Sequence, residues 1–137
     1  MSNNPVRFGL IGFGAWGQHH AQSIASTPGA TLAGIAAPSE ASRLAAAAAH
    51  PGVPVFPDHR ALLADVKPDV VDVVTPSHTH LEITRDSLAA GCDVLLEKPM
   101  AVTLEDCREI ARLARTSGRR VAVGHEFRIS SQWGKVK

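Results

Sequence analysis

The strongest constraint on this chain is its opening, where an apolar stretch at residues 6–11 leads through Gly12, Gly14 and Gly17 into a helical pattern. The spacing G-x-G-x-x-G between a strand and a helix is typical of a turn that holds a dinucleotide pyrophosphate. Gly12 makes the tight turn, Gly14 lets the backbone approach the phosphates, and Gly17 lets the helix pack closely on the strand. Glycines also mark ordinary turns, but the flanking strand and helix favour binding by the whole turn: Gly12, Phe13, Gly14, Ala15, Trp16 and Gly17.

Strand-like and helix-like segments alternate from one end of the 137-residue chain to the other. This alternation predicts an α/β fold, a doubly wound parallel sheet of the Rossmann type with helices on both faces, and the length fits a single domain. We expect strands near residues 6–11, 31–36, 53–56, 70–74, 94–96 and 121–123. Helices are expected from residue 15 and at residues 40–50, 59–64, 80–90 and 104–116, with Ser39 and Thr103 as N-caps.

The choice between two nicotinamide cofactors depends on the end of the second strand, where an acid would bind the adenosine ribose and repel a 2′-phosphate. The chain has Ala37 at this position. Ser39 and Arg43 are close enough in sequence to offer a hydroxyl and a guanidinium to a 2′-phosphate. The sequence therefore favours NADP, with NAD as the alternative. In the other interpretation, Ser39 only caps the next helix and Arg43 faces water.

Charge and composition argue against several other classes of protein. A net charge of +1 at pH 7 gives no electrostatic signature for binding nucleic acid or an anionic membrane. No apolar stretch is long enough to span a bilayer, and we expect a cytoplasmic protein. Cys92 and Cys107 lack the spacing of a redox or zinc site and are interpreted as reduced thiols.

The histidines offer two further hypotheses. His78, His80 and His125 could imitate a metal site, but no close carboxylate or cysteine completes a ligand set, so no metal is expected. His19 and His20 fall in the opening turns of the first helix. Either one of them faces the phosphates, or both pack against the protein or face solvent.

Four motifs, in this order, resemble the Gfo/Idh/MocA oxidoreductase family: GFGAWG at residues 12–17, TPSHTH at 75–80, GCDVLLEKP at 91–99 and GHEFR at 124–128. The resemblance implies the N-terminal NAD(P)-binding domain over residues 1–128, with residues 129–137 beginning a further region. It implies that Lys98 lies beside the nicotinamide and the reacting carbinol and is the catalytic residue. It also implies a cofactor cleft lined by Thr75, Pro76 and His80, a loop shaped by Glu97 and Pro99, and a nicotinamide side approached by His125 and Arg128.

The resemblance implies an NAD(P)-dependent oxidoreductase that transfers hydride to or from a sugar, polyol or similar hydroxyl-bearing small molecule. A partly desolvated lysine such as Lys98 can accept or relay the proton of an alcohol oxygen. Family members carry a further domain with the substrate pocket, so the chain is expected to be incomplete for catalysis alone. The alternative is a dinucleotide-binding module without activity of its own. A homodimer is favoured by apolar residues near the end of the chain, namely Phe127, Ile129, Trp133 and Val136.

Overall fold

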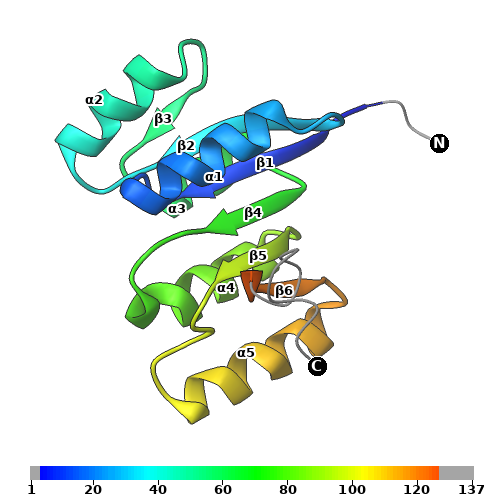
Figure 1. Ribbon diagram of the computed structural model, residues 1–137. Coiled ribbons are helices and arrows are strands. Elements are labelled where there is room, and N and C mark those ends of the chain that lie inside the picture. The colour runs from blue at the N-terminus through cyan, green and yellow to red at the C-terminus, as the bar shows by residue number, and fades with distance from the viewer. Residues whose placement is uncertain (1–3, 127–137) are drawn as a thin grey trace.

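The computed structural model describes residues 4–126, which form a six-stranded parallel sheet with helices on both faces (Figure 1). The strand order is β3-β2-β1-β4-β5-β6, the doubly wound order of the Rossmann fold, so the predicted fold class is confirmed. The strands are β1 Val6–Ile11, β2 Ala30–Ala36, β3 Val55–Phe56, β4 Val70–Val73, β5 Asp93–Glu97 and β6 Val121–Gly124. The helices are α1 Ala15–Ser26, α2 Glu40–Ala49, α3 His59–Val66, α4 His80–Ala89 and α5 Leu104–Ser117, and a single 3-10 turn, η1 Ser77–Thr79, precedes α4.

The core consists of two apolar layers, one on each face of the sheet, because successive residues of a strand point to opposite faces. On one face, the fully buried Leu10 and Ile35 pack with α1 and α2. On the other face, the fully buried Val71 and Leu96 pack with α3, α4 and α5. Burying each of these side chains stabilises the fold by about 1.5–3 kcal/mol. The continuous apolar runs of the sequence thus reflect strands covered on both sides.

Local capping signals in the sequence fix where the helices begin. Ser39 caps α2 and Thr103 caps α5, each by accepting a hydrogen bond from a backbone N–H three residues later, as predicted. Asp58 caps α3 in the same way. Gly118 ends α5 in the left-handed conformation, with φ of 67°. In the described part of the chain, two α-helices have no side-chain cap: α1, which follows Gly14, and α4, which continues from η1.

Predicted and observed element bounds agree to within two residues at every end, β3 included. The strand expected at residues 53–56 is reduced to Val55 and Phe56, which pair with Ile35 and Ala36 at the edge of the sheet. It begins after Pro54 because proline has no N–H to donate to a neighbouring strand. None of the helices within residues 4–126 has the length and apolarity needed to cross a membrane.

The connectivity of the sheet creates a crevice at the carboxyl ends of β1 and β4. The chain leaves β1 toward β2 and β3 on one side, then returns to β4 and continues to β5 and β6 on the other (Figure 1). In open parallel sheets, ligands bind outside the strand ends where the direction of winding reverses. The loops that follow β1, β2, β4 and β5 meet at this point.

Candidate functional site

The turn between β1 and α1 has no room for a side chain at two of its three glycines. Gly12 has a φ of 103°, a conformation that favours glycine, and a Cβ there would lie 2.1 Å from the carbonyl oxygen of Val74. A Cβ on Gly17 would lie 2.2 Å from the carbonyl oxygen of Gly12. A Cβ on Gly14, in contrast, would meet no atom within 4 Å. Gly12 and Gly17 therefore shape the turn, whereas Gly14 borders open space in front of α1.

The N-terminus of α1 presents its backbone to this open space. No side chain caps the helix, and its first turn contains no acidic residue. The free N–H groups of the first turn and the positive end of the helix dipole can therefore interact with a bound anion. A pyrophosphate fits such a position in size and charge.

A cleft extends from the turn in both directions along the strand ends. One half is a cavity of about 350 Å³ at the ends of β1, β2 and β4, and its lining includes Gly12, Ala37, Pro38, Thr75 and Pro76. The other half is a cavity of about 310 Å³ lined by Trp16, Val74, Thr75, Glu97 and Lys98. Thr75 borders both halves. Two cavities that meet beside an anion-binding turn are the arrangement that an extended dinucleotide requires.

The three residues considered for cofactor choice lie together after β2. Ala37 is buried, and no carboxylate takes its place at the strand end. The Ser39 hydroxyl is exposed and caps α2. Arg43 Nη1 donates hydrogen bonds to the carbonyl oxygens of Ala37 at 3.0 Å and Pro38 at 2.7 Å. These bonds hold the guanidinium at the end of β2, and its remaining N–H groups are available to a ligand.

The loop after β5 places Lys98 at the mouth of the second half of the cleft. Glu97 Oε2 accepts a hydrogen bond from the backbone N–H of Lys98 at 3.0 Å, and the peptide bond between Lys98 and Pro99 is cis. Lys98 Nζ lies 3.5 Å from Glu126 Oε1. A backbone hydrogen bond at Glu126 and the charge of Lys98 lower the pKa of the Glu126 carboxyl. The Lys98 side chain is 45% exposed, so residues 4–126 do not supply the desolvation that the sequence argument assigned to it.

His80 lies behind the cleft rather than in its wall. Its ring is fully buried, with Nε2 2.9 Å from the carbonyl oxygen of Thr75. Its Nδ1 lies 3.1 Å from the carbonyl oxygen of Pro99 and 3.2 Å from that of Met100. The expectation that His80 lines the cleft is thus corrected, because the first turn of α4 directs the ring inward between the loops after β4 and β5.

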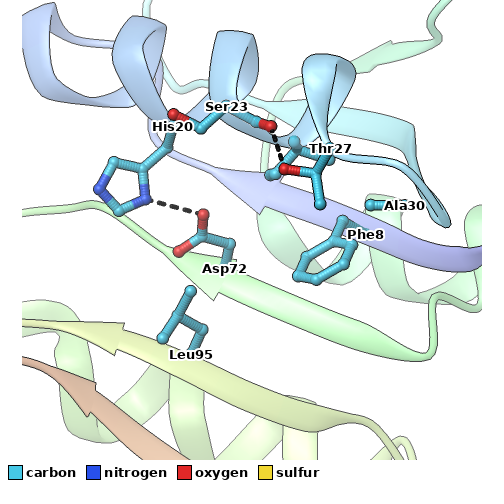
Figure 2. A pocket seen from close by; sticks show the side chains of 8 residues that line it. Phe8, His20, Ser23, Thr27, Ala30, Asp72 and Leu95 are labelled. Atoms are coloured by element: carbon cyan, nitrogen blue, oxygen red, sulfur yellow. Dashed lines mark hydrogen bonds and ion pairs between the residues drawn. The ribbon is translucent and has the colours of Figure 1, made fainter. Parts of the chain in front are cut away.

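A cluster of polar side chains lies on the α1 face of the sheet, and the sequence had not predicted its contacts. His20 Nδ1 lies 2.8 Å from Asp72 Oδ2, and its Nε2 lies 3.4 Å from Glu97 Oε1. Trp16 Nε1 donates a hydrogen bond to the same Glu97 oxygen at 3.2 Å. Figure 2 shows the His20 ring pointing from α1 toward Asp72 on β4, so this side chain pairs with a residue of the sheet. The only signal in the sequence was an acid within the apolar stretch at residues 70–73.

The contact with Asp72 changes the protonation of His20. The hydrogen bond to Asp72 raises the pKa of His20 above its ordinary value; burial opposes this effect, and the charges of Asp72 and Glu97 add to it. Asp72 is 1% exposed, and within residues 4–126 its Oδ1 has no hydrogen-bond partner. A buried carboxylate without a cation is costly, and His20 compensates the charge of Asp72 when its ring is protonated.

The other candidate residues are distributed around the cleft. His125 is exposed and lines a groove beside Trp16 and Glu97, together with Glu126. Asp58 and His59, which the sequence analysis had not singled out, line the first half of the cleft. Outside the described residues lie Arg128 and the apolar positions Phe127, Ile129, Trp133 and Val136.

One cluster has atoms close enough to hold a metal ion. His59, Glu82 and Asp86 bring ligand atoms within 4.8 Å of one another. Arg60 already pairs with both carboxylates, at 2.5 Å to Glu82 and 3.0 Å to Asp86. The charge of the cluster is therefore met by a guanidinium, and nothing else in residues 4–126 points to a metal there.

Together, the fold, the glycine turn and the two-part cleft define a dinucleotide-binding domain of the Rossmann class. Residues 6–125 match the Gfo/Idh/MocA family, described as an oxidoreductase family with an NAD-binding Rossmann fold. The chain belongs to this family and is its NAD(P)-binding domain, which confirms the resemblance inferred from the four motifs.

Individual relatives agree with this assignment. The chain is 38% identical to the uncharacterized oxidoreductase YdgJ of Escherichia coli, covering 100% of the chain and 39% of YdgJ. It is 34% identical to the D-glucoside 3-dehydrogenase of the same organism, covering 96% of the chain and 38% of that protein. Among solved structures, the WlbA dehydrogenase of Bordetella pertussis in complex with NADH and UDP-GlcNAcA superposes with a TM-score of 0.92 at 30% identity, over 98% of this chain and 41% of WlbA. The chain thus spans about two fifths of the length of the relatives it matches.

Proposed function

We propose that this chain supplies the cofactor site and the proton-handling lysine of an NAD(P)-dependent oxidoreductase that acts on a sugar, a polyol or a similar hydroxyl-bearing small molecule. The observation that carries the proposal is the place of Lys98, in the cavity that adjoins the glycine turn. A lysine in this position can exchange a proton with a substrate oxygen, which nucleotide binding alone does not require. The substrate class is supported by relatives named as dehydrogenases of D-glucosides and of inositol.

Each part of the cleft has a distinct role in this proposal. Residues 12–17 hold the pyrophosphate, with Thr75 and Pro76 beside the adenosine half. A bound nicotinamide supplies the hydride acceptor or donor. Lys98 Nζ accepts the proton of the substrate oxygen during oxidation, or returns it during reduction. Glu97 holds the Lys98 backbone, while His125 and Arg128 are proposed on the nicotinamide side.

The proposal includes a preference for NADP, with NAD as the alternative. It is supported by Ala37 at the end of β2 and by the Arg43 guanidinium, which the carbonyl oxygens of residues 37 and 38 hold at that end. Ser39 adds an exposed hydroxyl. Asp58, whose carboxylate caps α3, lines the same cavity, and an acid there favours NAD. WlbA and a scyllo-inositol dehydrogenase of Lactobacillus casei are described with NADH and NAD(H).

A second candidate function is a dinucleotide-binding module without turnover of its own. It is favoured by the exposure of Lys98 and by the share of the relatives that the chain spans. We propose residues 1–128 as the cofactor domain and residues 129–137 as the start of a further region. In this proposal, these 137 residues by themselves have negligible dehydrogenase activity, because their cleft leaves Lys98 exposed to water.

Calorimetric titration and a turnover assay test the two functions separately. Binding heats with NADH or NADPH are expected for the chain. Absorbance of reduced nicotinamide, followed with a panel of sugars and polyols, is expected to show negligible change. Sustained turnover by these 137 residues alone would contradict the expected lack of activity, and turnover that is indifferent to Lys98→Ala would contradict the role of this lysine.

Homodimerisation remains a prediction from the sequence near the end of the chain, where Phe127, Ile129, Trp133 and Val136 lie outside the described residues. Apolar side chains of this size stabilise an interface by about 1.5–3 kcal/mol each when buried. Light scattering over a concentration series is expected to show mass rising toward the dimer, with a weaker rise in Trp133→Ser. A strict monomer at high concentration would contradict this prediction.

A further inference from the structure

We infer that His20 and Glu97 are positioning residues that clamp the Lys98 loop to the dinucleotide helix α1. The inference deepens the proposed function and rests on it, since it concerns how the same cleft holds Lys98. Neither side chain has to contact the substrate for this role. The clamp consists of Trp16, His20, Asp72 and Glu97.

Glu97 is the central member because its two carboxylate oxygens face different elements. Oε2 accepts the backbone N–H of Lys98 at 3.0 Å. Oε1 accepts the indole N–H of Trp16 at 3.2 Å and lies 3.4 Å from His20 Nε2. Glu97 also lines both the cavity that contains Lys98 and the groove that contains His20. One side chain thus links the first two turns of α1 to the backbone of the proposed catalytic lysine.

Asp72 anchors the clamp to the sheet. It lies in the middle of β4, is 1% exposed, and has its Oδ2 2.8 Å from His20 Nδ1 (Figure 2). A protonated imidazole can donate from both nitrogens, to Asp72 on one side and to Glu97 on the other. A neutral imidazole donates from only one, and the closer contact is with Asp72. The link to Glu97 therefore depends on the imidazolium form of His20.

Other titratable groups around the clamp have different partners. His19, also on α1, packs edge-on against Trp16 with ring centroids 5.6 Å apart. Lys98 and Glu126 pair with each other across the loop, and His125 lines the groove beside them. Among residues 4–126, only His20 has ring nitrogens near both Asp72 and Glu97. A pH effect that requires both carboxylates can therefore be assigned to His20.

The test compares NADH with ADP-ribose, which has the adenosine and pyrophosphate but lacks the nicotinamide ring. The variant is His20→Gln, because glutamine keeps one donor for the buried Asp72 but cannot reach carboxylates on opposite sides of the ring. Ser23→Ala is the matched control, since Ser23 lies one turn further along α1 and lines a neighbouring cavity that His20 also borders, and its hydroxyl donates to the His19 carbonyl oxygen. Affinities are measured by titration at pH 6 and pH 9.

At pH 6, His20→Gln is expected to weaken NADH binding on the order of tenfold, the size of one lost charge-assisted hydrogen bond, and to leave ADP-ribose within twofold. In the unmodified chain, the ratio of NADH to ADP-ribose affinity is expected to fall as the pH rises to 9, and to be flat in His20→Gln. Ser23→Ala should behave as the unmodified chain. If His20→Gln loses affinity equally for NADH and ADP-ribose, or loses affinity for neither, the proposed clamp is wrong. If the unmodified chain binds neither ligand and does not bind NADPH, the proposed function itself fails.

A measurement without ligand tests the clamp independently. The ring signals of His20 in a nitrogen-15 NMR titration report when it loses its proton. If the clamp exists, Glu97→Gln should lower the pH at which the His20 ring loses its proton, because one of the two carboxylates near the ring is removed. Ser23→Ala should leave it unchanged. A titration of His20 that is identical in the unmodified chain and in Glu97→Gln would show that the two side chains do not interact, and would overturn the inference.

Discussion

The second and third glycines of the turn should respond in opposite ways to the same substitution. A Cβ on Gly14 meets no atom within 4 Å, whereas a Cβ on Gly17 would lie 2.2 Å from the carbonyl oxygen of Gly12. Gly14→Ala should therefore weaken dinucleotide binding in an intact fold, and Gly17→Ala should destabilise the fold itself. The two variants differ only in which glycine receives the methyl group, so each is the control for the other.

The stability of Gly14→Ala should remain close to that of the unmodified chain. Gly14 has φ of −76° and ψ of −171°, which any residue adopts. Replacing glycine lowers the entropy of the unfolded chain, which stabilises by about 0.4–1 kcal/mol. Alanine is a poorer N-cap than glycine by about 0.5–1 kcal/mol, so the two effects nearly cancel. The melting temperature should change by no more than about 3 °C.

Gly17→Ala forces a methyl group against backbone that cannot rotate away. Overpacking of this kind costs about 1–3 kcal/mol, and contact with a rigid carbonyl places the cost near the upper end. For a chain of this size, about 3 kcal/mol corresponds to a melting temperature lower by roughly 6–12 °C. Differential scanning calorimetry measures both variants directly.

Dinucleotide binding should respond in the opposite way to stability, since Gly14→Ala should impair binding directly. A methyl group on Gly14 occupies the space in which the pyrophosphate approaches α1, and the loss of one charge-assisted hydrogen bond weakens binding at least about tenfold. Calorimetric titration of NADH is the measurement. The assignment of the pyrophosphate to this turn is wrong if Gly14→Ala folds normally and binds NADH as tightly as the unmodified chain.

Three further predictions concern cofactor choice, pH and helix capping. Ala37→Asp should reverse a preference for NADPH over NADH, and Arg43→Ala should weaken NADPH alone by about ten- to a hundredfold in a fluorescence titration; equal binding of both cofactors by the unmodified chain would contradict this. The pKa of His20 is raised above its ordinary 6.5 by its hydrogen bond to Asp72, so its contribution to stability is complete below that value and is lost as the pH rises through the raised pKa. Urea unfolding should therefore show stability falling from pH 6 toward pH 9, and an equally steep fall in Asp72→Asn would refute the pairing. Thr103→Ala should lower the free energy of unfolding by about 1 kcal/mol through loss of the α5 cap and leave NADH binding unchanged, both measurable in the same chain.

Signals that lie close together in the chain determined most of the fold. Short apolar runs, of three to six residues, marked the strands. Ser39 and Thr103 marked the starts of α2 and α5, because each side chain accepts a hydrogen bond from the backbone N–H three residues later. The glycine spacing likewise placed a tight turn in front of α1. Such features depend on local backbone geometry, which the sequence of a short segment specifies on its own.

The partners of the polar side chains were decided by the tertiary structure. His20 meets Asp72 across 52 positions of sequence, and Trp16 meets Glu97 across 81, because α1 packs over β1 and the register of β1, β4 and β5 brings these residues to one face. His80 is withdrawn from the cleft because its place in α4 faces inward. Pairings of this kind depend on sheet order and register together, and neither is encoded by spacing along the chain. The sequence alone therefore determined the class of fold and the glycine turn before α1, while the network around Lys98 exists only once the parallel strands lie side by side.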